Sequence, residues 1–156
     1  MPIETLKRIL YDISILSKKV ARLETLENKF VGYVFVPLTS PLTSTSWDGD
    51  SFSTTAPTLI DLSAVFGVPA GVKAVYLSVV INDSGSAATA DVNISFYPAS
   101  GGIFAHVVYC GGIANDAMAA AQGIVPCDAN GDVYYSITAS GVGTLDVRIR
   151  IFGYWI

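Results

Sequence analysis

Apolar residues in the first thirty positions recur at alternating intervals of three and four residues. The series consists of Leu6, Ile9, Ile13, Leu16, Val20 and Leu23. A mean spacing of 3.5 residues is the period of a coiled-coil seam, and no Gly or Pro interrupts the chain between Pro2 and Gly32. We therefore predict one helix over residues 3–29. Because a single chain cannot bury so narrow a stripe, the pattern also predicts self-association.

The residues of this seam favour three copies. With Leu6 at heptad position a, Ile and Leu are mixed at both a and d, and Ile9 occupies a d position, which favours trimers over dimers. The next a position is Glu27. The seam therefore either stops there or slips by three residues and continues through Leu23, Leu26 and Phe30.

A charged motif lies at the carboxyl-terminal end of the predicted helix. Residues 22–27, Arg-Leu-Glu-Thr-Leu-Glu, resemble the trimerisation motif of short coiled coils, in which the arginine of one helix pairs with the glutamate of its neighbour. The alternative is an ordinary solvated charge pair, which contributes little stability. The predicted trimer interface comprises the seam and this charged pair: Leu6, Ile9, Ile13, Leu16, Val20, Leu23, Leu26, Phe30, Arg22 and Glu27.

From Val31 onward the hydrophobic period changes from 3.5 to 2, which is typical of β-strands. Strands are predicted at 31–36 (closed by Pro37), 58–62, 73–81, 90–97, 103–109, 133–137 and 145–151. Residues 37–57 are expected to form a long loop, with a short strand near 51–53 as an alternative, and residues 115–122 a loop or edge strand, with a helical turn as the alternative. Asn130-Gly131 is a hairpin signal.

These patterns predict a mainly β chain with two parts. Residues 1–30 form a coiled-coil trimerisation stem, and residues 31–156 form an antiparallel β-sandwich, jelly-roll-like, of about eight strands. Helical periodicity is expected only in the stem.

Composition and charge narrow the function. The chain is 51% hydrophobic and 14% charged, yet no run of 18 apolar residues is present, so the excess apolar surface is expected in subunit interfaces. Residues 1–30 carry a net charge of +2 and residues 31–156 a net charge of −6, which argues against nucleic-acid binding. We expect no signal peptide, because the start lacks a basic region followed by an apolar one.

Catalytic chemistry has little support in the sequence. His106 is the single histidine and lies in an apolar segment, and no Gly-x-Ser-x-Gly motif is present. We expect a structural or interface histidine, the alternative being three copies that share one metal ion. Cys110 and Cys127 fit no zinc spacing and are expected to be small buried hydrophobes, the alternative being a disulfide between them. The chain is therefore not expected to be an enzyme or to hold a metal or cofactor.

Two acidic segments are candidate ligand sites. Asp128 to Asp132 is expected to form a tight turn, the alternative being a divalent-ion site. Trp47 lies beside Asp48 and Asp50, and a tryptophan next to carboxylates suits sugar binding. The alternative is that the Trp47 ring anchors its loop on the domain or on the next subunit.

A short coiled coil followed by a low-charge β domain resembles bacteriophage virion proteins that form trimeric fibres or knobs. These include head fibres, capsid decoration trimers and short tail-fibre tips, and residues 58–75 are similar to strand-turn-strand passages in such proteins. The resemblance implies a non-enzymatic homotrimer of the virion, assembled in the host cytoplasm. Its expected partners are copies of itself, a capsid or tail protein and, for a receptor-binding tip or lectin-like trimer, a host-surface glycan. No membrane insertion is expected.

Overall fold

The computed structural model describes residues 3–29, 32–51, 54–85 and 91–156, with the side chains at Leu6, 23–29 and 54–55 outside that description. The chain divides into two compact units, Met1–Tyr33 and Val34–Ile156, and we call the second unit the head. The division lies three residues beyond the predicted boundary at residue 30.

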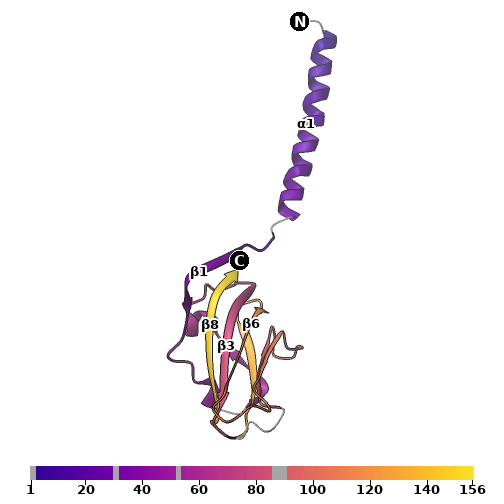
Figure 1. Ribbon diagram of the computed structural model, residues 1–156. Helices are drawn as coiled ribbons and strands as arrows, with labels where there is room; N and C mark the ends of the chain where they lie inside the picture. The colour runs from indigo at the N-terminus through magenta and orange to yellow at the C-terminus, as the bar shows by residue number, and fades with distance from the viewer. Residues whose placement is uncertain (1–2, 30–31, 52–53, 86–90) are drawn as a thin grey trace. The chain divides into compact units, whose positions relative to one another are not determined.

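The described elements are one long helix followed by eight strands and two short helical segments (Figure 1). In chain order they are α1 (Ile3–Lys29), β1 (Phe35–Leu42), the 3₁₀ turn η1 (Gly49–Ser51), β2 (Thr54–Ile60), α2 (Leu62–Phe66), β3 (Ala74–Asp83), β4 (Asn93–Tyr97), β5 (His106–Tyr109), β6 (Met118–Pro126), β7 (Val133–Thr138) and β8 (Leu145–Trp155).

The helix α1 has the bounds that the 3.5-residue period predicts. Every described side chain on it is exposed, including the seam residues Ile9, Ile13, Leu16 and Val20. Most of the stability of a helix in a protein comes from packing of its apolar face, and the described part of α1 has no such packing within the chain. In the described part of the chain, no helix has the length and apolar character required to span a membrane.

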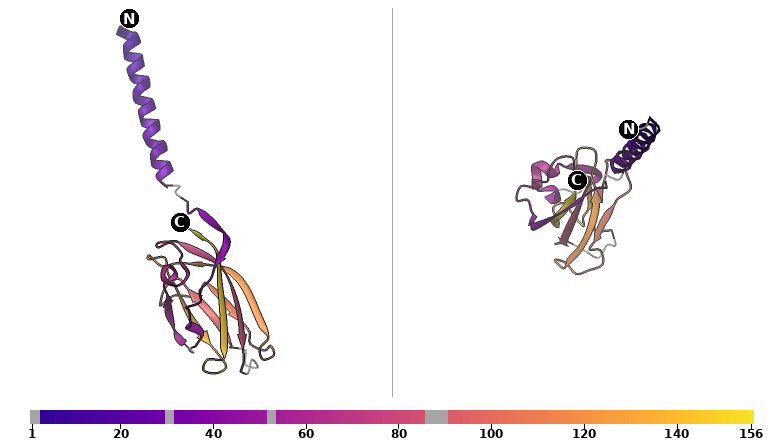
Figure 2. Two further views of the ribbon diagram at one scale, coloured as in Figure 1. Left: turned by 90° about the vertical axis from the view of Figure 1, so that its left-hand side faces the viewer. Right: turned by 90° about the horizontal axis from the view of Figure 1, so that it is seen from above.

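The eight strands of the head form two four-stranded antiparallel sheets, which confirms the predicted mainly β class and strand number. The first sheet has the order β1-β8-β3-β6 and the second the order β2-β7-β4-β5. Strand pairs join β1 to β8, β2 to β7, β3 to β6 and β4 to β5. Only β4 and β5 are consecutive strands within one sheet, so each other connection passes between the sheets. Figure 2 shows the strands of the head from two further sides.

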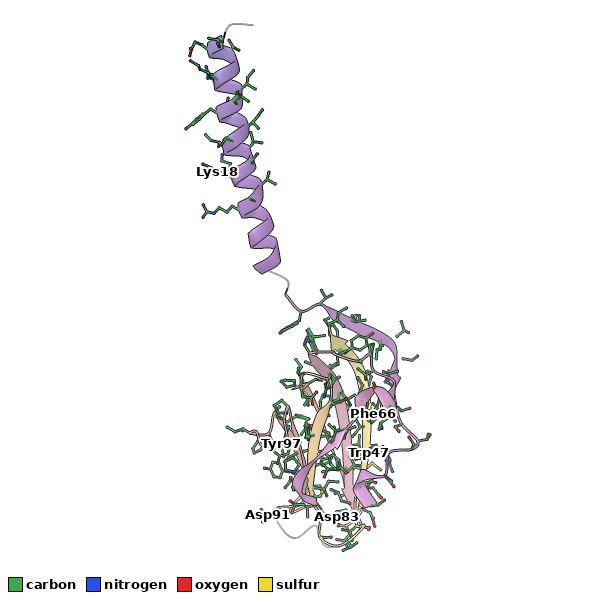
Figure 3. All side chains as sticks on the ribbon, turned by 180° about the vertical axis from the view of Figure 1, so that it is seen from behind. Lys18, Trp47, Phe66, Asp83, Asp91 and Tyr97 are labelled. Carbon is green, nitrogen blue, oxygen red and sulfur yellow. The ribbon has the colours of Figure 1, made fainter. Side chains whose placement is uncertain are left out.

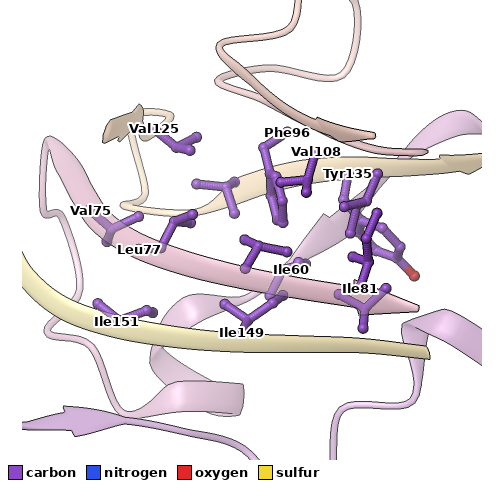
Figure 4. Packing of buried hydrophobic residues seen from close by; sticks show 14 of the residues in the cluster. Ile60, Val75, Leu77, Ile81, Phe96, Val108, Val125, Tyr135, Ile149 and Ile151 are labelled. Atoms are coloured by element: carbon purple, nitrogen blue, oxygen red, sulfur yellow. The ribbon is translucent and has the colours of Figure 1, made fainter. Parts of the chain in front are cut away.

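Both sheets contribute to one hydrophobic core (Figure 4). Alternate residues of β3 and β8 point inward, among them Leu77 and Ile151, and Phe96 and Val108 face them from the second sheet. Full burial stabilises the fold by about 1.5–3 kcal/mol for each such side chain. The inward alternation within β3, β7 and β8 is the period of 2 read from the sequence.

The first strand differs from the prediction. A strand closed by Pro37 was expected, followed by a loop to residue 57, but β1 continues to Leu42 through Pro37 and Pro41, and β2 begins at Thr54. β1 is an edge strand that pairs with β8 alone, and its register shifts between Pro37 and Leu42. Proline has no backbone N–H, and an edge strand with a bulge tolerates that loss.

Two local predictions need correction. Residues 62–66 form the helix α2, although helical structure was expected only in the stem: Asp61 caps its first turn by accepting from Ala64 N, and Gly67 closes it with φ +74°. Asn130-Gly131 forms a turn, with Gly131 at φ +95°, but the flanking strands β6 and β7 belong to different sheets and make no hairpin. Residues 118–126 form the edge strand β6, one of the two forms predicted for the Ala-rich segment 115–122, and the strand extends four residues beyond that segment.

Candidate functional site

One face of α1 carries a continuous apolar strip, which we define as Ile9, Ile13, Leu16 and Val20. Between 42% and 62% of each of these side chains is exposed. Ser17 and Ala21 line the same shallow depression as Ile13, Leu16 and Val20. Small neighbours leave the strip open to a second helix. This face can therefore bind another apolar surface but has no group that does chemistry.

The remaining predicted interface residues are less fully described. Arg22 is exposed on α1. The side chains of Leu6, Leu23, Leu26 and Glu27 lie outside the described part of the chain, and Phe30 lies outside the described residues altogether. The predicted contact between Arg22 and Glu27 of two chains therefore stays a prediction.

On the head, Trp47 lines a hollow of about 210 Å³ where β8 runs past the end of β1. Figure 3 labels Trp47 and Phe66, which lie on the same side of the head. The register of β1 on β8 ends at Leu42 and Ile151, so the preceding part of β8 faces the segment around Trp47 instead. The lining residues are Thr43, Ser44, Trp47, Phe66, Val147, Arg148, Ile149 and Arg150.

Trp47 is held in place by its neighbours. Its backbone N–H donates to Ser44 Oγ at 3.1 Å, and its ring meets the ring of Tyr135 edge-on with centroids 5.4 Å apart. The Tyr135 hydroxyl donates to Gly49 O at 3.1 Å. A Cβ at Gly49 would lie 2.5 Å from the Trp47 ring, so only glycine allows this approach. The expectation that Trp47 anchors its loop on the domain agrees with these contacts.

Asp48 and Asp50, the two carboxylates proposed beside Trp47, do not line the hollow. Asp50 Oδ2 accepts from Val147 N at 2.9 Å and thereby ties the loop to β8. Asp48 is exposed. Burial raises the pKa of Tyr135, and the charges of Asp50 and Asp48 raise it further. The Asp50 carboxylate thus has a structural partner.

Two arginines that sequence reasoning did not select line the same hollow. Arg148 and Arg150 are separated by one residue on β8, so both point away from the core on the same face of the strand. Both are exposed. In the sequence, these two arginines could have been noticed because they lie two positions apart in residues 34–156, where Lys73 is the only other cation. What the sequence does not contain is their proximity to Trp47.

His106 packs against glycine and an aromatic ring. A Cβ at Gly123 would lie 2.5 Å from His106 Nδ1, and the rings of His106 and Phe96 stack with centroids 6.4 Å apart. Its Nε2 atom is buried and has no hydrogen-bond partner in the structure. Burial lowers the pKa of His106. These contacts are compatible with the structural role expected for His106, which stays a prediction.

The segment 128–132 forms the expected turn. Asp128 Oδ1 accepts from the backbone N–H groups of Asn130, Gly131 and Asp132 at 2.9–3.1 Å. Asp132 Oδ1 accepts from Leu62 N at 3.0 Å and so positions the start of α2. Among the residues that the structure describes, no group of three His, Cys, Asp or Glu side chains is arranged to hold a metal ion.

Cys110 and Cys127 are both free thiols, and Cys110 is buried as expected. Cys127 is half-buried; burial raises its pKa to about 12, with Asp128 and Asp132 adding to the shift. A thiol with so high a pKa is a poor nucleophile at neutral pH.

The strip on α1 and the hollow beside Trp47 are thus the two candidate binding surfaces. Compared with known proteins, the chain matches no protein-family model and no curated sequence.

Proposed function

We propose that the protein is a non-enzymatic homotrimeric component of a phage virion, in which α1 forms a coiled-coil stem and the head is displayed. The observation that carries the proposal is the exposed apolar strip of Ile9, Ile13, Leu16 and Val20. Its 3.5-residue period suits a coiled coil, and its mixture of Ile and Leu suits three strands.

The energetics of the strip also favour assembly. Full burial of an Ile, Leu or Val side chain is worth about 1.5–3 kcal/mol, so burying the exposed half of four side chains adds about 4 kcal/mol per chain. Association costs roughly 4–15 kcal/mol in lost freedom of motion. The strip alone is therefore marginal. The proposed interface accordingly includes Leu6, Leu23, Leu26 and Phe30 and the pair Arg22–Glu27.

The strand order supports a jelly-roll β-sandwich for the head. The pairs β1–β8, β2–β7, β3–β6 and β4–β5 are those of one long hairpin of eight strands, with β4–β5 at its closed end. Curling that hairpin joins β8 to β3 and β7 to β4 and gives the two sheets. Jelly rolls of this kind are common in viral capsid and lectin domains.

Within the virion we favour a head fibre or capsid decoration protein, with a capsid or tail protein as the attachment partner. A second role, contact of the head with a host-surface glycan as in a receptor-binding tip, is favoured by the hollow beside Trp47. Mass spectrometry and labelled-antibody imaging of purified particles test the virion assignment. If the protein is missing from intact particles, the assignment is wrong.

The mass of the full chain in solution tests the assembly. Light scattering should give three times the chain mass of 16.5 kDa. Ile13→Asp places a charge in each copy of the strip and should yield monomers with reduced helix content. Tyr11→Asp is the matched control, because Tyr11 is 66% exposed on the same helix but lies outside the heptad seam. A monomeric wild type, or equal dissociation by both variants, contradicts the trimer.

A further inference from the structure

The hollow beside Trp47 combines a fixed aromatic ring with two cationic side chains. Arg148 and Arg150 come from one strand, and Trp47 comes from a loop tied to that strand through Asp50 and Val147. Because the Tyr135 ring and Gly49 hold the Trp47 ring, the aromatic wall exists before any ligand arrives. Preorganised walls lower the cost of binding.

The charge at the hollow is opposite to that of the head around it. Residues 34–156 hold nine aspartates against three cations, and two of those cations line this one hollow. Within the described part of the chain, neither Arg148 nor Arg150 forms an ion pair. Their planar guanidinium groups match carboxylates in two-point hydrogen bonds. The local chemistry therefore selects an anion although the head is acidic.

The size and the aromatic wall restrict the ligand further. A volume of about 210 Å³ lies below the roughly 300 Å³ at which sites begin to enclose drug-sized ligands, so the hollow accepts one small ring. The C–H face of a pyranose is apolar and packs on an indole ring. Thr43 and Ser44 add hydroxyl groups to the lining, which suit the hydroxyl groups of a sugar.

We propose that this hollow binds an acidic sugar residue, such as a uronic or sialic acid unit, with its ring against Trp47 and its carboxylate on Arg148 and Arg150. The hollow lies within a single head, so the site does not depend on the trimer or on the virion assignment. Trp47 was expected to act with Asp48 and Asp50. In the structure the side chains that line the hollow with Trp47 are Arg148 and Arg150 rather than those two carboxylates, which favours an acidic sugar.

Nuclear magnetic resonance of the full chain tests the proposal, because its two indole N–H signals separate the hollow from the rest of the head. Adding glucuronate or N-acetylneuraminate should shift the Trp47 signal saturably. The Trp155 signal should stay in place, since Trp155 does not line the hollow. Trp47→Phe assigns the two signals. Glucose at the same concentration should leave both unchanged.

Charge variants identify the carboxylate partners. The double substitution Arg148→Gln with Arg150→Gln should weaken binding at least about tenfold, the loss expected when charge-assisted hydrogen bonds are removed. Lys73→Gln is the matched control, because it removes the head's third cation, which does not line the hollow, and should bind as wild type does.

Three results would overturn the proposal. Equal shifts of the Trp47 signal with glucose and glucuronate mean that Arg148 and Arg150 do not distinguish an acidic sugar from a neutral one. Equal affinity for acetate and glucuronate at matched ionic strength means that the hollow binds a carboxylate but does not recognise the sugar ring. Undiminished binding by the double arginine variant, with its fold intact by circular dichroism, means that the carboxylate lies elsewhere.

Discussion

Asp83 offers the sharpest test of how the head is held together. Its carboxylate is 1% exposed at the end of β3. Oδ1 accepts from Gly85 N at 2.8 Å and from Ser140 Oγ, and Oδ2 accepts from Ser140 N at 2.9 Å and Thr144 Oγ1 at 3.2 Å. This one side chain therefore fastens the connection between β7 and β8 to the end of β3.

The cost of Asp83→Asn follows from those contacts. Hydrogen bonds to a charged group are worth about 1.5–3 kcal/mol each but do not add within a network. Asparagine retains one acceptor oxygen and turns an NH₂ group toward buried donors, so we expect a loss of about 2–4 kcal/mol. With a denaturant slope of about 1–3 kcal/mol/M, the urea midpoint should fall by roughly 1–2 M.

Urea unfolding followed by tryptophan fluorescence measures this loss, since both tryptophans belong to the head. Asp91→Asn is the matched control, because Asp91 is exposed and a surface change of this kind costs within about 0.5 kcal/mol (Figure 3). The reasoning fails if both variants unfold at the same urea concentration.

The pH dependence of the head's stability is a second test of the role of the Asp83 carboxylate. Burial by itself would raise the pKa of Asp83, but the hydrogen bonds from Ser140, Gly85 and Thr144 outweigh it and lower the pKa. A lowered pKa means that the carboxylate stabilises the head above about pH 4, and that this contribution is lost as the pH falls through the folded value. The gap between wild type and Asp83→Asn should stay constant from pH 7 to 5 and narrow below pH 4. An equal gap at pH 3 and pH 7 would contradict the assignment.

Three further predictions concern the interior of the head. Burial lowers the pKa of His106, so protonation of this residue destabilises the head and the wild-type urea midpoint should fall as the pH drops from 7 to 5. In His106→Gln the midpoint should depend less on pH. An equal pH dependence in both proteins would exclude His106 as the cause. Gly123→Ala brings a Cβ against the His106 ring and should cost about 1–3 kcal/mol, whereas Gly101→Ala meets open space and should unfold at the wild-type midpoint. Cys110 and Cys127 have raised pKa values, so iodoacetamide at pH 8 should alkylate them slowly until urea is added; rapid labelling in the folded state, read by mass spectrometry, would contradict their burial.

Local patterns in the sequence are sufficient for the parts of the fold whose causes are local. The 3.5-residue period predicts α1 with its bounds, and period 2 finds most strands, because both repeats are carried by neighbouring side chains. The short helix α2 also has local signals in Asp61 and Gly67, which can be recognised as an N-cap and a left-handed C-terminal glycine.

What the sequence does not contain is the pairing of distant segments. β1 passes through two prolines because β8, more than a hundred residues later, supplies its partner. The hollow has the same origin: the bond from Val147 to Asp50 joins residues 97 apart and brings Trp47 next to Arg148 and Arg150. Adjacency in sequence instead suggested Asp48 and Asp50 as the partners of Trp47, although neither lines the hollow.

The position of β8 has a consequence for how copies of this protein are made. Ribosomes synthesise β8 after the other seven strands, yet it lies between β1 and β3 in the first sheet. That sheet therefore cannot close until translation has passed residue 155, and pairings so distant in sequence form slowly. The helix α1 leaves the ribosome long before, so in the proposed trimer the stems of nascent chains would be free to pair while their heads are still unfinished.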